Sequence, residues 1–236
     1  MKIGIVSDLH LEFRDAAKCA DIVWKIRDAK CDLIVMAGDI HPSKEFRENL
    51  IESIETGDNL TGSNRSDRGD TNKPVRFVMG NHDWYHSDFY VPDIEDANNI
   101  VSSPLFTNFA ECPNTIAISA FRINDFRMTR MLDPNRYRDA YYDHVDHIFD
   151  SKSAVVVTHW SPTMKAVSKR FEGELLNSYF CNNLDERIKN SNKKLWVFGH
   201  VHSRWDFMIG DCRMVSNPLG YPREISEAYD VKIVEV

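Results

Sequence analysis

The sequence lacks any apolar stretch near the roughly 20 residues that a membrane-spanning helix needs. Its first six residues also lack the long apolar segment and small-residue cleavage site of a secretion signal, and they read instead as a core strand. We therefore expect no membrane segment, and we expect the fold to start at residue 1.

Cysteine is scarce, and its spacing shows no pairing pattern. The five cysteines are scattered and never form a Cys-x-x-Cys pair, at Cys19, Cys31, Cys112, Cys181 and Cys212. This excludes a disulfide framework and a thiolate zinc knuckle, and it predicts a reduced, cytoplasmic setting.

Basic charge is also in short supply, with 29 Lys and Arg against 36 Asp and Glu and a net charge of −7. A protein that coats a nucleic-acid backbone needs clustered Lys and Arg, so this class is disfavoured. A nuclease stays open as an alternative, because bound divalent cations would reverse the field of an acidic site locally.

The chain alternates strand and helix patterns through its first half. Helical apolar spacing covers residues 16–26, 46–54, 141–148 and 176–188, and strand-like runs lie at 3–7, 33–37, 75–79, 115–121, 154–158, 195–198, 205–209, 212–216 and 230–235. Several of these runs are apolar on both faces, which is typical of α/β strands covered on both sides. The later strands follow one another closely, with a hairpin expected at 209–211 and a second sheet behind it.

We predict a single domain over residues 1–236 with a polar loop inserted at about 56–73. That loop contains only one sizeable apolar residue, Leu60, and loops of this length are surface segments or substrate lids.

Five short polar clusters follow strand-like runs, and they carry the chemistry. They are Asp8-Leu9-His10, Gly38-Asp39, Gly80-Asn81-His82-Asp83, Thr158-His159 and Gly199-His200-Val201-His202. Open α/β sheets bind their ligands at the carboxyl ends of the strands, so these side chains are expected to meet at one edge. Residues two apart on an extended backbone point to the same side, which lets Asp8 and His10 reach one cation. The Asp39 carboxylate has two oxygens and can bridge two cations.

The mixture of nitrogen and oxygen ligands predicts a transition ion. Mn is the expected ion, with Fe, Zn, Co or Ni as alternatives, whereas Ca and Mg prefer cages made of oxygen alone.

Each motif alone is weak, but the ordered set resembles the calcineurin-like metallophosphoesterase superfamily. The family pattern of Asp-x-His, Gly-Asp, Gly-Asn-His-Asp/Glu, His and Gly-His-x-His is complete between residues 8 and 202. The resemblance implies an α/β fold of two stacked mixed β-sheets flanked by helices. It also implies two divalent ions, one held by Asp8, His10, Asp39 and His202, and the other by Asp39, Asn81, His159 and His200.

More narrowly, the chain resembles small bacterial and phage phosphoesterases that begin Ser-Asp-Leu-His-Leu-Glu-Phe and end near Asn-Pro-x-Gly-Tyr-Pro. Both signatures are present, at residues 7–13 and 217–222. The resemblance implies a hydrolase in which metal-activated water attacks phosphorus, with His82 donating a proton to the departing oxygen. Asp83 is expected only to shape its turn.

The expected substrate is a small phosphodiester or phosphomonoester with a nucleotide-like structure. A nuclease is the alternative, and a non-catalytic metal-binding scaffold is disfavoured because every ligand position is intact. His41, Asn124 and Arg127 are candidate substrate contacts, since His41 lies near a ligand and Arg suits phosphate oxygens. His144 and His147 are expected on an exposed polar stripe of their helix.

Overall fold

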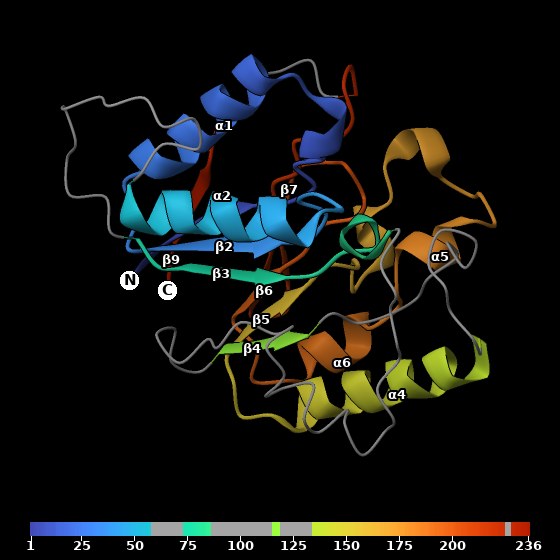
Figure 1. The fold of residues 1–236 in the computed structure, drawn as a ribbon. Coiled ribbons are helices and arrows are strands. Elements are labelled where there is room, and N and C mark those ends of the chain that lie inside the picture. Colours follow the sequence, from blue (N-terminus) through green and yellow to red (C-terminus); the bar gives the residue numbers. More distant parts are fainter. Residues whose placement is uncertain (58–72, 86–114, 119–133, 225–227) are drawn as a thin grey trace.

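A computed structural model of the chain describes residues 1–57, 73–85, 115–118, 134–224 and 228–236 (Figure 1). Side chains at 84, 115–118 and 134–141 lie outside this description. The described strands are β1 (Lys2–Val6), β2 (Leu33–Ala37), β3 (Val75–Val78), β4 (Thr115–Ile118), β5 (Val155–Thr158), β6 (Leu195–Val197), β7 (Trp205–Ile209), β8 (Cys212–Ser216) and β9 (Lys232–Glu235). Each of them overlaps a strand predicted from the sequence, so the strand pattern is confirmed.

The strands form two mixed sheets. One has the order β3-β2-β1-β9 and the other β4-β5-β6-β8-β7. Neighbouring strands are parallel except at one edge of each sheet. There β9 pairs antiparallel with β1, and β7 pairs antiparallel with β8. The predicted hairpin is present, because Ile209 pairs with Cys212 across Gly210, whose φ is 57°.

Helices cover the outer faces of the two sheets. In Figure 1, α1 and α2 lie over the first sheet, and α4 and α6 lie on the far side of the second. The described helices are α1 (Ala16–Asp28), α2 (Lys44–Thr56), α4 (Pro134–Asp150), α5 (Asn177–Phe180) and α6 (Asp185–Lys189), with short 3-10 turns η1 (Leu11–Phe13), η2 (His82–Trp84), η3 (Met164–Ala166) and η4 (Lys169–Phe171). This is the four-layer sandwich that the sequence predicts.

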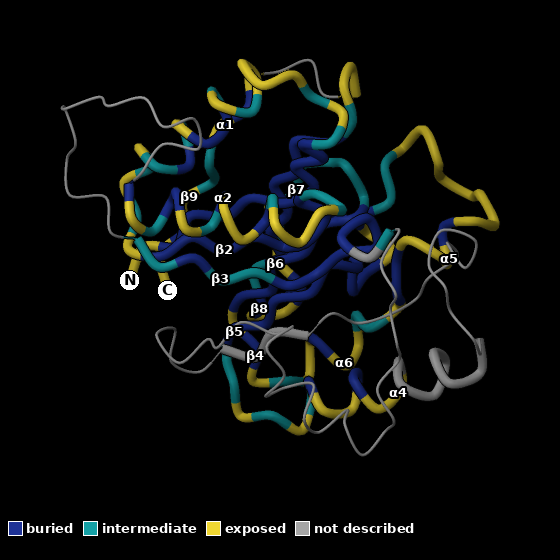
Figure 2. Tube along the Cα trace, in the orientation of Figure 1, coloured by how far each residue is buried: buried dark blue, intermediate teal, exposed yellow. Residues whose placement is uncertain are grey.

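The alternation of side chains along each strand fills three cores. In β2, Leu33 and Val35 face the second sheet, whereas Ile34 and Met36 pack against α1 and α2. Likewise Trp196 of β6 belongs to the core beneath α4 and α6. In Figure 2, β2 is dark blue along its length, because all five of its residues are buried. Full burial of such side chains stabilises the fold by about 1.5–3 kcal/mol each, which explains why these runs are apolar on both faces.

Local signals set the ends of the first two helices. Asp15 caps α1 by accepting a hydrogen bond from Lys18 N at 2.8 Å, and Ser43 caps α2 by accepting one from Phe46 N at 3.3 Å. Gly57 ends α2 in the left-handed region. Both helices therefore begin directly after the loops that carry Asp8, His10 and Asp39.

Two expectations about the second half are wrong. The pattern at 176–188 does not form one helix, because Cys181 is extended and bridges to Ser161, which separates α5 from α6. His144 is not on an exposed stripe but is 5 % exposed, since it lies one turn before the buried Ile148 on the same face of α4. Burial, followed by the nearby His147, lowers the pKa of His144 to about 4.

The inserted loop predicted at 56–73 lies almost wholly outside the described residues. Across the described ranges, no helix combines the length and apolar character needed to cross a bilayer. Four cysteines are described, and all four are free thiols.

Candidate metal centre

The seven predicted ligands meet at the carboxyl ends of the parallel strands. Each follows β1, β2, β3, β5 or β6 by a few residues, as the sequence predicts. Because the two sheets stack with these ends at one edge, the loops of both sheets converge there.

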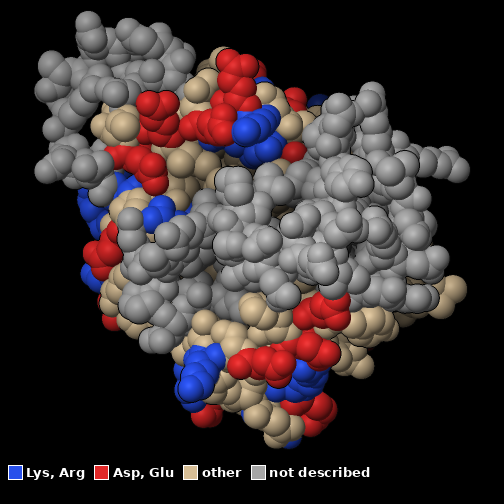
Figure 3. Space-filling view, turned by 60° about the horizontal axis from the view of Figure 1, so that its bottom comes forward, with Lys and Arg blue, Asp and Glu red and all other residues tan. Residues whose placement is uncertain are grey.

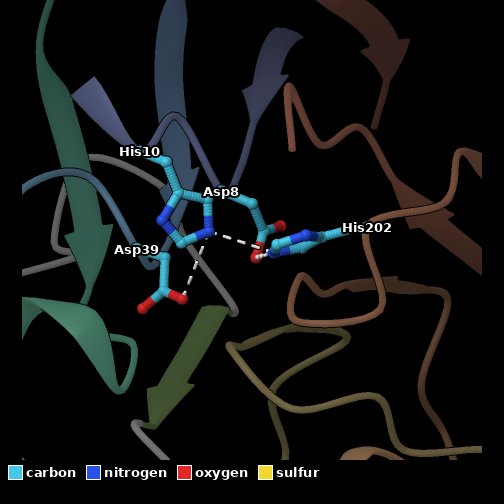
Figure 4. Close-up of side chains that lie close together, drawn as sticks. All are labelled: Asp8, His10, Asp39 and His202. Atoms are coloured by element: carbon cyan, nitrogen blue, oxygen red, sulfur yellow. Dashed lines mark hydrogen bonds and ion pairs between the residues drawn. The ribbon is translucent and has the colours of Figure 1, made fainter. Parts of the chain in front are cut away.

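The first cluster consists of Asp8, His10, Asp39 and His202, whose ligand atoms all lie within 4.8 Å of one another (Figure 4). His10 Nε2 is 3.0 Å from His202 Nε2 and 3.7 Å from Asp39 Oδ2. His202 Nε2 is 3.5 Å from Asp8 Oδ1. The structure therefore brings together the whole of one predicted half-site.

The second cluster consists of Asp39, His159 and His200, joined by Asn81. His159 Nε2 is 3.5 Å from Asp39 Oδ2 and 3.1 Å from Asn81 Oδ1. Asp39 therefore belongs to both clusters, and its carboxylate lies where they meet.

The atoms of the two clusters fit divalent ions. Asp8 Oδ2 and His200 Nε2 are buried, and neither has a hydrogen-bond partner in the described part of the protein. Such an arrangement costs about 1–3 kcal/mol for each neutral group unless something else uses the lone pair. His159 donates from Nδ1 to the Ala37 carbonyl at 2.8 Å, which directs the lone pair of Nε2 into the cluster. The donors are imidazole nitrogens and carboxylate or amide oxygens, which suits a transition ion.

Backbone strain is concentrated in these ligands. Six described residues other than glycine have positive φ, and five of them are predicted ligands: Asp8, His10, Asp39, His200 and His202, with φ between 43° and 69°. Left-handed residues of this kind persist only where the surroundings hold them, and they are typical of functional sites. Here the holding contacts include His200 N donating to Asp8 Oδ1 at 2.8 Å.

Glycines let the loops approach closely. A Cβ at Gly80 would lie 2.6 Å from Asp39 N, and one at Gly199 would lie 2.7 Å from Asp8 Oδ2. A side chain at either position would push a ligand loop away from the site. The glycines before Asn81 and His200 are therefore a geometric requirement of the cluster.

The charges of the two clusters stabilise each other. Burial alone would raise the pKa of Asp39, but the facing imidazoles of His159 and His10 hold it well below its usual range. Burial alone would lower the pKa of His159, but Asp39 raises it to about 9. Burial alone would also lower the pKa of His202, but Asp8 and Glu224 raise it to about 10. In the protein without ions, the raised pKa values of His159 and His202 favour their protonated forms at neutral pH, so protons and metal ions compete for these ring nitrogens.

His82 lies beside the clusters and is held at both ring nitrogens. Its Nδ1 is 3.0 Å from Glu12 Oε1, and its Nε2 is 2.8 Å from the Tyr221 hydroxyl. Burial alone would lower the pKa of His82, but the hydrogen bond to Glu12 and the charge of Asp39 raise it. Glu12 stays ionised, because contacts with His10 and His82 outweigh burial and lower its pKa to about 2.

Asp83 does more than shape its own turn. Its carboxylate accepts hydrogen bonds from the backbone of the loops after β2 and β3, at distances of 2.8 to 3.1 Å from Asp39 N, Ile40 N, His41 N and Gly80 N. Arg47 Nη1 lies 4.0 Å from Asp83 Oδ1. Burial and the neighbouring Asp39 raise the pKa of Asp83, which means that they disfavour its ionised form. The four N–H donors offset this cost of holding a buried carboxylate. Asp83 thereby fixes the loop that carries the shared ligand.

Replacing Asp83 with alanine is expected to lower the free energy of unfolding by about 3 kcal/mol or more. The change leaves four backbone N–H groups and the buried Arg47 without their carboxylate partner. Urea denaturation measures the loss. Asp32→Ala is the matched control, because the exposed Asp32 carboxylate accepts a single exposed backbone bond from Lys2 N at 2.7 Å. Equal stability of the two variants would contradict the role of Asp83.

Of the three candidate substrate contacts, only His41 lies among the described residues, and it belongs to neither cluster. His41 Nδ1 accepts a hydrogen bond from Ser43 N at 2.9 Å, and its ring stacks on Phe46 with centroids 4.2 Å apart, so His41 lies at the entrance to α2. Asn124 and Arg127 lie outside the described residues.

A cavity of about 430 Å³ opens beside the clusters. Asp39, His82 and His200 line it, and residues of the segment 166–181 form a further part of its wall. Its size is in the range of sites for small molecules. A phosphoryl group at the clusters would therefore have its ester groups in this cavity.

Sequence reasoning gave no role to Glu12 or Glu224, although both contact predicted site residues. Glu224 Oε2 is 2.7 Å from His202 Nδ1 and also accepts a hydrogen bond from Tyr221 N at 2.9 Å. Glu12 had a signal, because it belongs to the motif at residues 7–13. Glu224 follows the second motif by two residues, next to Arg223 at φ 77°, and nothing in its spacing marks it.

Comparison with known proteins agrees with this geometry. A family model described as calcineurin-like phosphoesterase matches residues 1–204. A search of curated proteins finds no match to the chain.

Two solved structures share the fold at low sequence identity. The phosphopantetheinyl hydrolase PptH of Mycobacterium tuberculosis is 13 % identical, with a TM-score of 0.56 over 94 % of this chain and 90 % of that one. GAP50 of Plasmodium, the anchor in the inner membrane complex, is 14 % identical, with a TM-score of 0.52 over 98 % of this chain and 74 % of that one. At such identities the similarity concerns the fold alone.

Proposed function

Since this chain belongs to the calcineurin-like phosphoesterase family and is a metal-dependent hydrolase, we propose that it cleaves a small phosphate ester with two divalent transition ions. The observation that carries the proposal is the convergence of the seven donors in two clusters that share Asp39. One ion would be held by Asp8, His10, Asp39 and His202, and the other by Asp39, Asn81, His159 and His200. Bound there, such ions lower the pKa of water and neutralise charge on the phosphoryl group.

The residues around the ions have separate tasks in this proposal. His82 is the proton donor to the departing oxygen, because it lines the cavity together with Tyr221, whose hydroxyl is 2.8 Å from His82 Nε2. Glu12 accepts from Nδ1, which orients the ring and supports the protonated form. Asp83 holds the loop of the shared ligand in place.

We propose a nucleotide-like phosphodiester or phosphomonoester as the substrate and Mn as the ion. The cavity beside the clusters suits a small molecule, which supports this choice over a nucleic-acid strand. On the face drawn in Figure 3, Lys and Arg side chains of the described residues are interspersed with Asp and Glu. On this face, the described side chains form no basic track that would support binding of a nucleic-acid backbone. The free thiols support a cytoplasmic location.

The proposed activity is tested with manganese-loaded protein against bis(p-nitrophenyl) phosphate, p-nitrophenyl phosphate, a nucleotide panel and single-stranded DNA. We expect release of p-nitrophenolate from at least one of the two esters and no degradation of DNA. Protein that binds manganese but hydrolyses none of the small esters would contradict the proposal.

Replacing Glu224 with alanine is expected to weaken metal binding at the Asp8, His10, Asp39 and His202 cluster about 10- to 100-fold. The carboxylate holds His202 Nδ1 at 2.7 Å, so its loss frees the imidazole ring to turn away from the ion. Isothermal titration with Mn²⁺ measures the affinity of each site. Glu174→Ala is the control, since Glu174 lines the same cavity but belongs to neither cluster. An equal effect of both changes would show that only cavity charge matters.

A further inference from the structure

Residues of the segment 166–181 form a wall of the cavity that carries an apolar patch. The patch consists of three cavity-lining side chains, Phe171, Leu176 and Phe180, which are 40 %, 56 % and 36 % exposed. Leaving such side chains in water costs free energy that a ligand would recover by covering them. The position of the three residues on the rim of a cavity, rather than scattered over the surface, indicates a binding wall.

Hydrogen bonds hold this wall in a fixed shape. The Asn177 side chain is buried and donates to the Phe171 carbonyl at 2.6 Å. Asn182 is also buried and donates from Nδ2 to the Ser161 carbonyl at 2.9 Å, next to the bridge between Ser161 and Cys181. A wall held in this way binds without the entropy cost of ordering a loose segment.

The wall reaches the metal centre directly. The ring of Phe180 stacks on the ring of His200, with centroids 5.0 Å apart and planes 25° apart. Tyr85 and Tyr221 line the cavity beside His82. An ester group on a phosphorus atom at the centre would therefore contact these aromatic rings directly.

Charge along the cavity disfavours a second strongly anionic group. Arg170 is the only Lys or Arg among the described residues that line it, and its guanidinium lies 4.4 Å from the centroid of the Phe171 ring. Glu174 and Glu224 line the same space. Away from the metal ions, the cavity is therefore suited to an uncharged group.

We propose that the substrate is a phosphodiester whose second ester group is uncharged and apolar or aromatic, and that Phe171, Leu176 and Phe180 select it. The inference rests on the proposed function and narrows the substrate class of the same site. An aromatic group with no further phosphate would lie along the wall, with the phosphodiester at the two clusters. A nucleoside polyphosphate or a nucleic-acid strand would place negative charge beside Glu174 and Glu224.

The test compares two esters that share one leaving group. Bis(p-nitrophenyl) phosphate and methyl p-nitrophenyl phosphate both release p-nitrophenolate, and they differ in whether the remaining ester group is aromatic or methyl. With manganese-loaded protein, we expect kcat/KM to be roughly tenfold higher for the aryl diester. Phe171→Ala and Leu176→Ala should each lower this ratio about fivefold, which corresponds to about 1 kcal/mol.

Leu175→Ala is the matched control. Leu175 is adjacent to Leu176 and is 93 % exposed, but it does not line the cavity. The kcat/KM ratio of the two esters should be the same for this variant as for the unchanged protein. All three variants are at exposed positions, where the fold tolerates alanine.

The possible results separate the two proposals. If the ratio is near one in the unchanged protein, or if Leu175→Ala changes it as much as Leu176→Ala does, the wall does not select the ester group. In that case hydrolysis of the methyl ester still supports the proposed function. If manganese binds and neither diester is hydrolysed, p-nitrophenyl phosphate separates the two proposals. Its hydrolysis would keep the proposed function and overturn the diester inference, whereas inactivity on all three esters would overturn both.

Discussion

Replacing Asp39 with alanine will remove both metal ions and lower kcat/KM by more than about a hundredfold. Changes to groups that merely support a ligand typically cost 10- to 100-fold, so losing a ligand shared by two ions must cost more. Asp39 Oδ2 is 3.7 Å from His10 Nε2 and 3.5 Å from His159 Nε2, and no other residue belongs to both clusters among those described. The readout is metal content by mass spectrometry together with hydrolysis of an aryl phosphodiester.

Two further variants make this result specific. Asp39 Oδ1 also accepts a hydrogen bond from His82 N at 2.8 Å, so Asp39→Asn keeps that acceptor while removing the charge. His200→Ala removes a ligand of one cluster only and should leave about one ion per chain. Asp206→Asn is the control for a lost carboxylate, because Asp206 pairs with Arg213 and Lys232 far from the cavity residues. Retention of two ions by Asp39→Ala would show that the carboxylate is not shared.

The fold could be predicted from the sequence because its signals are local. A run such as 33–37 is apolar at every position, and this is only stable between two covered faces. The prediction of one helix at 176–188 was wrong because a long-range contact determines the backbone conformation there. The apolar spacing there suits a helix, but the bridge between Ser161 and Cys181 makes the chain extend in the middle.

The predicted ligands come together for a similar reason. Each follows a strand within a few residues, so the sheet order alone brings them to one edge. No comparable rule predicts where the residues that support the ligands lie. Glu224 approaches His202 from a turn 22 positions later, and its side-chain contact depends on how that turn lies over the site.

The burial of His144 and the structure of the wall at 166–181 were likewise not predictable from the local sequence. His144 is polar, so its spacing suggested an exposed stripe, whereas its position one turn before Ile148 buries it. The wall consists of short helices and turns, and the periodic pattern that reaches into it, at 176–188, predicted a helix much longer than α5. Substrate selection therefore depends on the part of the chain whose sequence says least about structure.

Replacing His82 with alanine or glutamine will leave the metal content unchanged and lower turnover about 10²- to 10⁴-fold. His82 is outside the two clusters that share Asp39, and its Nδ1 is held by Glu12 rather than by a proposed ion. If its task is to protonate the departing oxygen, the loss must depend on the leaving group. An alkyl phosphodiester releases a strongly basic alkoxide and should show the full effect, whereas p-nitrophenolate leaves readily and should show a much smaller one.

This dependence separates proton transfer from simple binding. A residue that only binds the phosphoryl group would lower kcat/KM by the same factor for alkyl and aryl esters, because the phosphoryl group is identical in both. His147→Ala is the control for a lost imidazole, since His147 is exposed on α4 and lines no part of the cavity. Equal losses on both esters would assign His82 to substrate binding and leave the proton to another group. A larger loss on the alkyl ester, with two ions still bound, is the result that only a proton donor at His82 explains.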